Sequence, residues 1–251
     1  SATIPRFACA CHKNNIAVRL AIKKDKYLPK VLRVLSAFSA KHRTSINRVK
    51  LSIERRARLR LENQTRWSSS FLMLESFQKG YKKGIFSEEY PCPVKLVAIE
   101  TYMQILLPAF QFNLAMQYST YSICDVLPYL HIMISKWERM TVKSQYQPLC
   151  RNLIKAFKHK FDYEINSSVY HVAALFQVSK LKQWFNRADC ADLRLNAIKE
   201  LTSVAMHFLK RSLETPESSN RDNEASLSQS SRESNIGFID DCEYTNQNEI
   251  G

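Results

Sequence analysis

Apolar residues recur at intervals of three and four along most of this chain, as they do on one face of an α-helix. Residues 14–40 predict a helix in which Pro29 marks a break or a start, and residues 44–61 predict a second, very basic helix. Thr65 is placed to cap a third helix, which Gly84 would end. Further amphipathic stretches fall at residues 94–117 with an interruption at Pro108, at 122–137, at 146–162 and at 189–210. The pattern predicts a mainly α-helical protein.

Strand-like patterns are confined to two short stretches. Residues 3–8 favour a strand, and residues 169–176 fit either a strand or a helix. Several Trp and His side chains fall in helical or apolar contexts, and we expect all of them in the core: Trp137, Trp184, His131, His159 and His171.

Composition supports a helical fold, because the 251 residues include only 4 Gly and 8 Pro, too few for a turn-rich all-β protein. The net charge of +14 favours a polyanionic partner, with nucleic acid first and an anionic membrane surface second. No apolar stretch approaches the roughly 20 residues of a membrane span. The seven scattered cysteines are typical of reduced thiols in a cytosolic or nuclear protein.

The charge is unevenly distributed along the chain. Residues 1–85 hold 20 Lys and Arg against 4 Asp and Glu, whereas residues 211–251 hold 3 against 9. The latter stretch is rich in Ser and Asn and poor in apolar residues, so we expect it to be disordered.

The segment from Cys9 to His12 contains two thiols and an imidazole, which are natural zinc ligands. A structural zinc site needs four ligands, and no second Cys/His pair stands at a usable spacing. The better interpretation from spacing alone is a set of small buried residues where a strand meets a helix.

Two features favour nucleic-acid binding. Arg66 and Trp67 stand near a helix start, where Trp can stack on an unpaired base while Arg grips a phosphate. The alternative places Trp67 in the core and makes Arg66 a capping or ion-pairing residue. Residues 41–60 carry eight Lys and Arg against one Glu, which suits either a phosphate-binding face or a solvated one. The basic residues expected on the phosphate-binding face are Arg48, Lys50, Arg55, Arg56, Arg58 and Arg60.

These pieces occur in an order that resembles the hAT class of DNA transposases. Cys9 to His12 resembles the C-x-x-H segment of the family, and Arg66-Trp67 resembles the T-R-W-N-S segment about fifty residues later. Residues 106–110 and 125–130 resemble the L-x-P-F and V-L-P helices that follow in the family, and residues 173–180 resemble its A-x-L-D-P-R segment without the D-P-R triplet. The resemblance covers roughly residues 4–210.

The resemblance implies a ribonuclease-H-like core interrupted by an all-helical insertion domain. Residues 1–85 would form a partial ribonuclease-H-like region with basic helices, residues 86–210 the insertion domain, and residues 211–251 the acidic tail. Arg66 and Trp67 match the pair that handles a distorted base in the family, and Cys9 and His12 match the pair that supports that region. The implied partner is DNA in the nucleus, with neither a membrane nor a small-molecule substrate. Homo-oligomers are implied only for a full-length form.

Cutting DNA in this family requires carboxylates that hold Mg²⁺ or Mn²⁺. The family's catalytic Asp residues lie upstream of the C-x-x-H segment, and none of the eight residues before Cys9 is acidic. No family pattern surrounds any Glu after residue 210. We therefore expect a DNA-binding remnant with no catalytic residues and no cofactor, unless carboxylates outside this chain supply the metal site. The alternatives are a domesticated scaffold or chromatin-associated protein, a fragment of an active transposase, and the unstable product of a decayed gene.

Overall fold

A computed structural model describes residues 8–42, 59–63, 66–86, 88, 91–118, 121–141, 147–176 and 178–214. The described residues form ten α-helices and one 3-10 helix, with no strand among them. The prediction of a mainly helical protein is confirmed. Residues 3–7 of the predicted N-terminal strand lie outside the described residues, and Ala8 is not in a strand. The segment that fitted either a strand or a helix belongs to the helix α9 (Ser168–Phe176).

The first predicted helix is divided into α1 (Ala10–Lys24) and α2 (Leu28–Lys41). Asp25 follows α1, and its Oδ1 accepts hydrogen bonds from the backbone N–H groups of Tyr27 (2.9 Å) and Leu28 (2.7 Å). These N–H groups have no acceptor within a helix that begins here, so the carboxylate stabilises the start of α2. Pro29 occupies the first turn of α2, where its missing N–H costs nothing, and it is a helix start as predicted.

The helix α4 (Ser68–Lys82) ends just before Gly84, in agreement with the predicted stop at this glycine. Gly84 has a φ of 61°, which a residue without Cβ adopts without strain. Its N–H donates to Tyr81 O (3.0 Å), and the next N–H, of Ile85, donates to Gly80 O (3.0 Å). This is the Schellman arrangement, which turns the chain while it satisfies the last carbonyl groups of the helix. The predicted cap, Thr65, lies outside the described residues.

The helix α5 (Leu96–Ala115) continues through Pro108 and is not interrupted there. Burial explains the difference, because Pro108 and most of its neighbours are enclosed by other helices. The following helix, α6 (Ile123–Thr141), begins after Ser122, whose N–H donates to the Asp125 carboxylate (2.8 Å). Trp137 of α6 is fully buried, as predicted, and its Nε1–H donates to Ile105 O of α5 (2.7 Å).

The remaining elements are joined by short connections: α7 (Gln147–Lys160), α8 (Asp162–Asn166), α9, α10 (Val178–Trp184), the 3-10 helix η1 (Ala188–Cys190) and α11 (Ala191–Glu214). Trp184 and His171 are buried as expected, and His131 is half-buried. His159 is exposed, so its predicted place in the core was wrong. It lies on the side of α7 opposite the buried residues Leu153 and Phe157.

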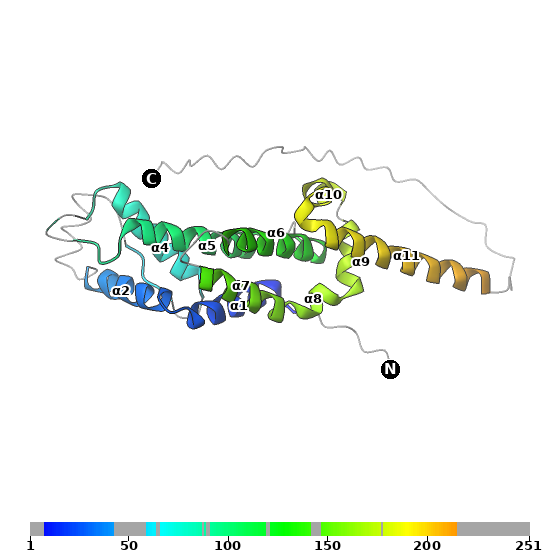
Figure 1. Cartoon of the computed structure of the whole chain (residues 1–251), viewed down its shortest axis with the longest axis horizontal. Coiled ribbons are helices and arrows are strands. Elements are labelled where there is room, and N and C mark those ends of the chain that lie inside the picture. The colour runs from blue at the N-terminus through cyan, green and yellow to red at the C-terminus, as the bar shows by residue number, and fades with distance from the viewer. Residues whose placement is uncertain are drawn as a thin grey trace, which may run out of the picture. The chain divides into compact units, whose positions relative to one another are not determined.

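The chain divides into two compact units, residues 1–210 and 211–251. In the first unit α1 packs beside α7 and α5, α4 packs on α5, and α6 packs on α7 and α9 (Figure 1). Helices on both sides of residue 85 therefore share one hydrophobic core. A largely enclosed ion pair joins α1 to α8, because Lys13 Nζ lies 2.5 Å from Glu164 Oε1.

Glu164→Gln should destabilise the fold strongly, because it leaves the Lys13 ammonium largely enclosed without its counter-charge. The expected loss is about 3 kcal/mol of unfolding free energy, measured by urea denaturation. The exposed pair Lys158–Glu138 is the matched control, and Glu138→Gln should cost less than about 1 kcal/mol. Equal losses for the two variants would show that the buried pair does not stabilise the contact between α1 and α8.

Candidate functional site

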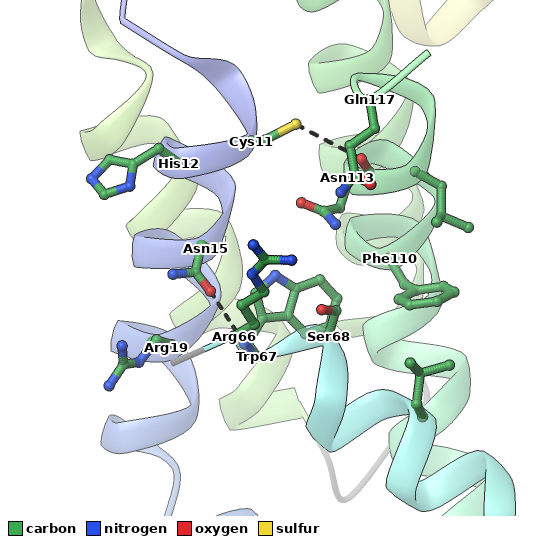
Figure 2. Close-up of a pocket in the computed structure, with 12 residues that line it drawn as sticks. Cys11, His12, Asn15, Arg19, Arg66, Trp67, Ser68, Phe110, Asn113 and Gln117 are labelled. Carbon is green, nitrogen blue, oxygen red and sulfur yellow. Dashed lines mark hydrogen bonds between the residues drawn. The ribbon is translucent and has the colours of Figure 1, made fainter. Parts of the chain in front are cut away.

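A pocket of about 1160 Å³ lies between α1, the start of α4 and the C-terminal half of α5. It brings His12 together with Arg66 and Trp67, which stand more than fifty residues later in the sequence. Figure 2 shows Arg66 and Trp67 lying between α1 and α5. The lining residues are Cys11, His12, Asn15, Arg19, Arg66, Trp67, Ser68, Leu72, Phe110, Asn113, Leu114 and Gln117.

One wall of the pocket is a single face of α1. Cys11, Asn15 and Arg19 are spaced four residues apart, so they stand one above another on the helix. The Cys11 Sγ–H donates to Asn113 O of α5 (3.8 Å), which is a weak link across the pocket. The sequence analysis missed Asn15 and Arg19, although their spacing of four and eight residues from Cys11 places both on the same helical face as Cys11.

Asn15 fixes the entry to α4 in place of a local capping side chain. Trp67 precedes the first residue of α4 and makes no side-chain capping bond of its own. Its backbone N–H donates instead to Asn15 Oδ1 of α1 (3.1 Å), a contact drawn in Figure 2. The position of the Arg66–Trp67 pair therefore depends on a residue of α1.

Trp67 belongs to the hydrophobic core, with 3% of its surface exposed. Its ring meets Phe110 edge-on at 6.2 Å between centroids, and Phe110 in turn stacks on Phe71 at 4.2 Å. Its Nε1–H is buried and has no hydrogen-bond partner among the described residues. Leaving such a donor unpaired costs about 1 to 3 kcal/mol, so an acceptor from outside the chain would relieve a real penalty.

The pocket is positively charged. Arg19 and Arg66 are exposed and permanently cationic, and the described residues that line the pocket include no Asp or Glu. In Figure 2, the side chains of His12 and Arg19 extend from α1 away from α5, so they lie at the edge of the pocket, whereas Arg66 lies between the two helices. Burial, reinforced by the neighbouring Cys9, raises the pKa of the Cys11 thiol, which therefore stays protonated near neutral pH. This combination suits the binding of an anion that carries hydrogen-bond acceptors.

The other predicted site residues are not gathered at this pocket. Cys9 is exposed at the start of α1 and is absent from the lining. Arg60 is also exposed and away from the lining, and it lies in an irregular segment, so the predicted helix does not extend to residues 59–61. The rest of the predicted basic face lies outside the described residues: Arg48, Lys50, Arg55, Arg56 and Arg58.

The described part of the chain offers no group of three or more His, Cys, Asp or Glu side chains that could hold a metal ion. Within that same part, every helix is too short or too polar to cross a lipid bilayer.

No family model, curated protein or solved structure matches this chain.

Asn15→Ala should loosen the start of α4, because the Trp67 backbone N–H then loses its acceptor. We expect a loss of about 1 kcal/mol of unfolding free energy, measured by thermal or urea denaturation. Asn196→Ala, on an exposed position of α11, is the matched control and should change stability by less than about 0.5 kcal/mol. A fully stable Asn15→Ala variant would show that Asn15 does not position Trp67.

The rate at which each cysteine thiol is alkylated should fall as its burial increases. Alkylation requires the thiolate, so the raised pKa of Cys11 slows its reaction at pH 7.5 relative to the exposed Cys9. Cys150 and Cys190 should react last, since both are buried and burial raises the pKa of each to about 11. Peptide mapping after timed iodoacetamide treatment measures the order, and faster modification of Cys11 than of Cys9 would contradict it.

Proposed function

We propose that this chain is a DNA-binding protein derived from a hAT-class transposase and that it cuts no DNA. The observation that carries the proposal is the cationic pocket whose lining includes His12, Arg66 and Trp67. The resemblance assigns His12 and the Arg66–Trp67 pair to two separate motifs, and the proposal is supported because these residues line one pocket. Nuclear localisation is part of the proposal, because DNA is the expected ligand.

Phosphate recognition would come from the two arginines. Each guanidinium presents several N–H donors in a plane, which matches the oxygen atoms of a phosphate group. The Arg19 side chain lies at the edge of the pocket and Arg66 lies inside the pocket. Successive phosphates of one DNA strand could therefore contact both guanidinium groups. Such contacts release counterions, so the affinity should fall steeply as salt is added.

Trp67 would contribute through its N–H edge. A base that stacks on the indole face needs that face exposed, whereas here the ring is packed into the core. The unpaired Nε1–H can instead donate to a phosphate or base oxygen that enters the pocket. This assigns the residue both a structural role and a binding role.

We propose that the chain does not cut DNA because of the residues that line the pocket. Two-metal phosphoryl transfer requires carboxylates to hold the ions, and the described pocket lining supplies none. Mg²⁺ or Mn²⁺ enters the proposal only if carboxylates outside this chain provide the ligands. The finer fold assignment, a partial ribonuclease-H-like region in residues 1–85, remains a prediction. The regular secondary structure among the described residues of that region consists of helices, without a strand.

The binding test uses the full chain and fluorescent duplex and hairpin DNA over a series of salt concentrations. Replacing Arg19 and Arg66 together by Gln should weaken binding at least about 10-fold and reduce the salt slope by about 1 to 2. The control replaces two exposed arginines outside the pocket, Arg33 and Arg151, and so removes the same charge. Equal effects of the two double variants would show that binding depends on total charge and not on the pocket.

Trp67→Phe tests the indole N–H separately from packing, because Phe keeps an aromatic ring in the core. We expect roughly 5- to 10-fold weaker binding, with the helical circular dichroism signal and a cooperative melting transition retained. Binding equal to that of the unaltered chain would leave Trp67 as a core residue only.

A further inference from the structure

A second pocket, of about 560 Å³, lies between α5, α6 and the first turn of α7. Positions 101, 104, 108 and 111 of α5 line it, whereas positions 110, 113, 114 and 117 line the cationic pocket. At about 100° per residue, these two sets lie on nearly opposite faces of α5. The pockets are therefore separate, and we call the second one the α5–α6 pocket.

The lining of the α5–α6 pocket is mainly apolar. Its apolar residues include Leu107 and Met140, which are partly exposed, and Ile105, Pro108 and Cys150, which are buried. Its volume falls within the range of about 300 to 1,000 Å³ that is usual for binding pockets. An apolar group that enters removes its own surface and that of the lining from water, which is favourable. The lining therefore suits an apolar side chain.

Pro108 leaves a backbone acceptor without its usual partner at this pocket. A proline has no N–H, so the Gln104 carbonyl lacks the donor that normally bonds it from four residues later. The next carbonyl, of Ile105, accepts from Trp137 Nε1 of α6 (2.7 Å). Gln104 and Pro108 both line the pocket, so the gap in the hydrogen bonding of α5 adjoins it. An N–H donor from a ligand would fill this gap.

The α5–α6 pocket is also cationic, because Lys136 and Arg139 line it and the described lining includes no Asp or Glu. Lys136 is half-buried and takes part in none of the ion pairs among the described residues. Arg139 lies 3.5 Å from Asp189 Oδ2, but that carboxylate also accepts two shorter bonds from Arg187 (2.9 and 2.8 Å). One carboxylate thus serves two guanidinium groups, and the remaining positive charge favours a ligand with a carboxylate.

We propose that the α5–α6 pocket binds a short segment of a partner protein in which an apolar side chain stands next to Asp or Glu. The apolar side chain would fill the pocket, a backbone N–H of the segment would donate to the Gln104 carbonyl, and the carboxylate would pair with Lys136 and Arg139. A fatty-acid anion offers the apolar body and the charge but no N–H donor, and a nucleic-acid backbone offers no apolar side chain. The proposal is independent of DNA binding, because the two pockets share no lining residue.

Fluorescence anisotropy of the full chain with a labelled peptide tests the site. The probe is a peptide of about 12 residues with Asp-Leu-Phe-Glu at its centre and Gly and Ser elsewhere. We expect a dissociation constant of about 10 to 500 µM. Peptides with Lys-Leu-Phe-Lys or Asp-Ser-Ser-Glu at the centre should bind at least about 10-fold more weakly. Equal binding of all three peptides, or no binding of the probe at about 1 mM, would overturn the proposal.

Lys136→Glu tests the charge of the pocket. It should weaken binding of the acidic probe at least about 5-fold and strengthen binding of the Lys-Leu-Phe-Lys peptide. Lys155→Glu, at an exposed position of α7 outside the pocket, changes the net charge equally and should leave both affinities within about 2-fold. The same effect from both variants would mean that the peptide senses the total charge of the protein and not this pocket.

Pro108→Ala tests the Gln104 carbonyl. Alanine has the N–H that proline lacks, so α5 bonds this carbonyl itself, and binding of the probe should weaken about 3- to 10-fold. The helical circular dichroism signal should be retained, because alanine is the best helix former. Unchanged binding would overturn the role of the carbonyl. If dodecanoate displaced the probe and bound the variant as tightly as the unaltered chain, the pocket would be a site for an amphipathic small molecule and the peptide proposal would fail.

Discussion

The position of α1 constrains the rest of the first compact unit. Three side chains in its first half bind partners far along the chain: Lys13 binds the Glu164 carboxylate, Asn14 Nδ2 donates to Ala109 O (3.1 Å), and Asn15 accepts from Trp67. Lys13 and Asn14 make these bonds from largely enclosed positions, where an unmet polar group is costly. Burial of such groups is tolerated only when the partners are in register, so these bonds select one placement of α1 among α4, α5 and α8.

The same helix gives the pocket its character. Asn14 and Asn15 of α1 bond to α5 and to the start of α4, and Arg19 adds positive charge at the edge of the pocket. A cavity between rigid helices keeps its shape without a ligand, which lowers the entropic cost of binding. The unpaired indole N–H of Trp67 works against stability, as does the unpaired Oδ1 of Asn14, and such features are concentrated at functional sites.

Periodicity was sufficient to predict most of the longer helices, because α2, α6 and α7 each have one clearly apolar face. It also located the start at Pro29 and the end at Gly84, where the chemistry of single residues decides the backbone conformation. It failed at Pro108, because the cost of a proline inside a helix was offset by burial that no local pattern reveals. The pocket could be predicted only in part. The resemblance identified Arg66 and Trp67, but the edge-on packing of the indole arises from contacts between residues distant in sequence.

The ion pair between Lys13 and Glu164 joins residues 151 positions apart. A ribosome adds about 5 to 20 residues per second, so Lys13 emerges roughly 8 to 30 s before its partner exists. During that interval the apolar face of α1, with Ala17, Val18 and Ala21, has none of its α7 contacts. Nascent chains of this protein should therefore present α1 to chaperones until the last third of the first unit has been synthesised.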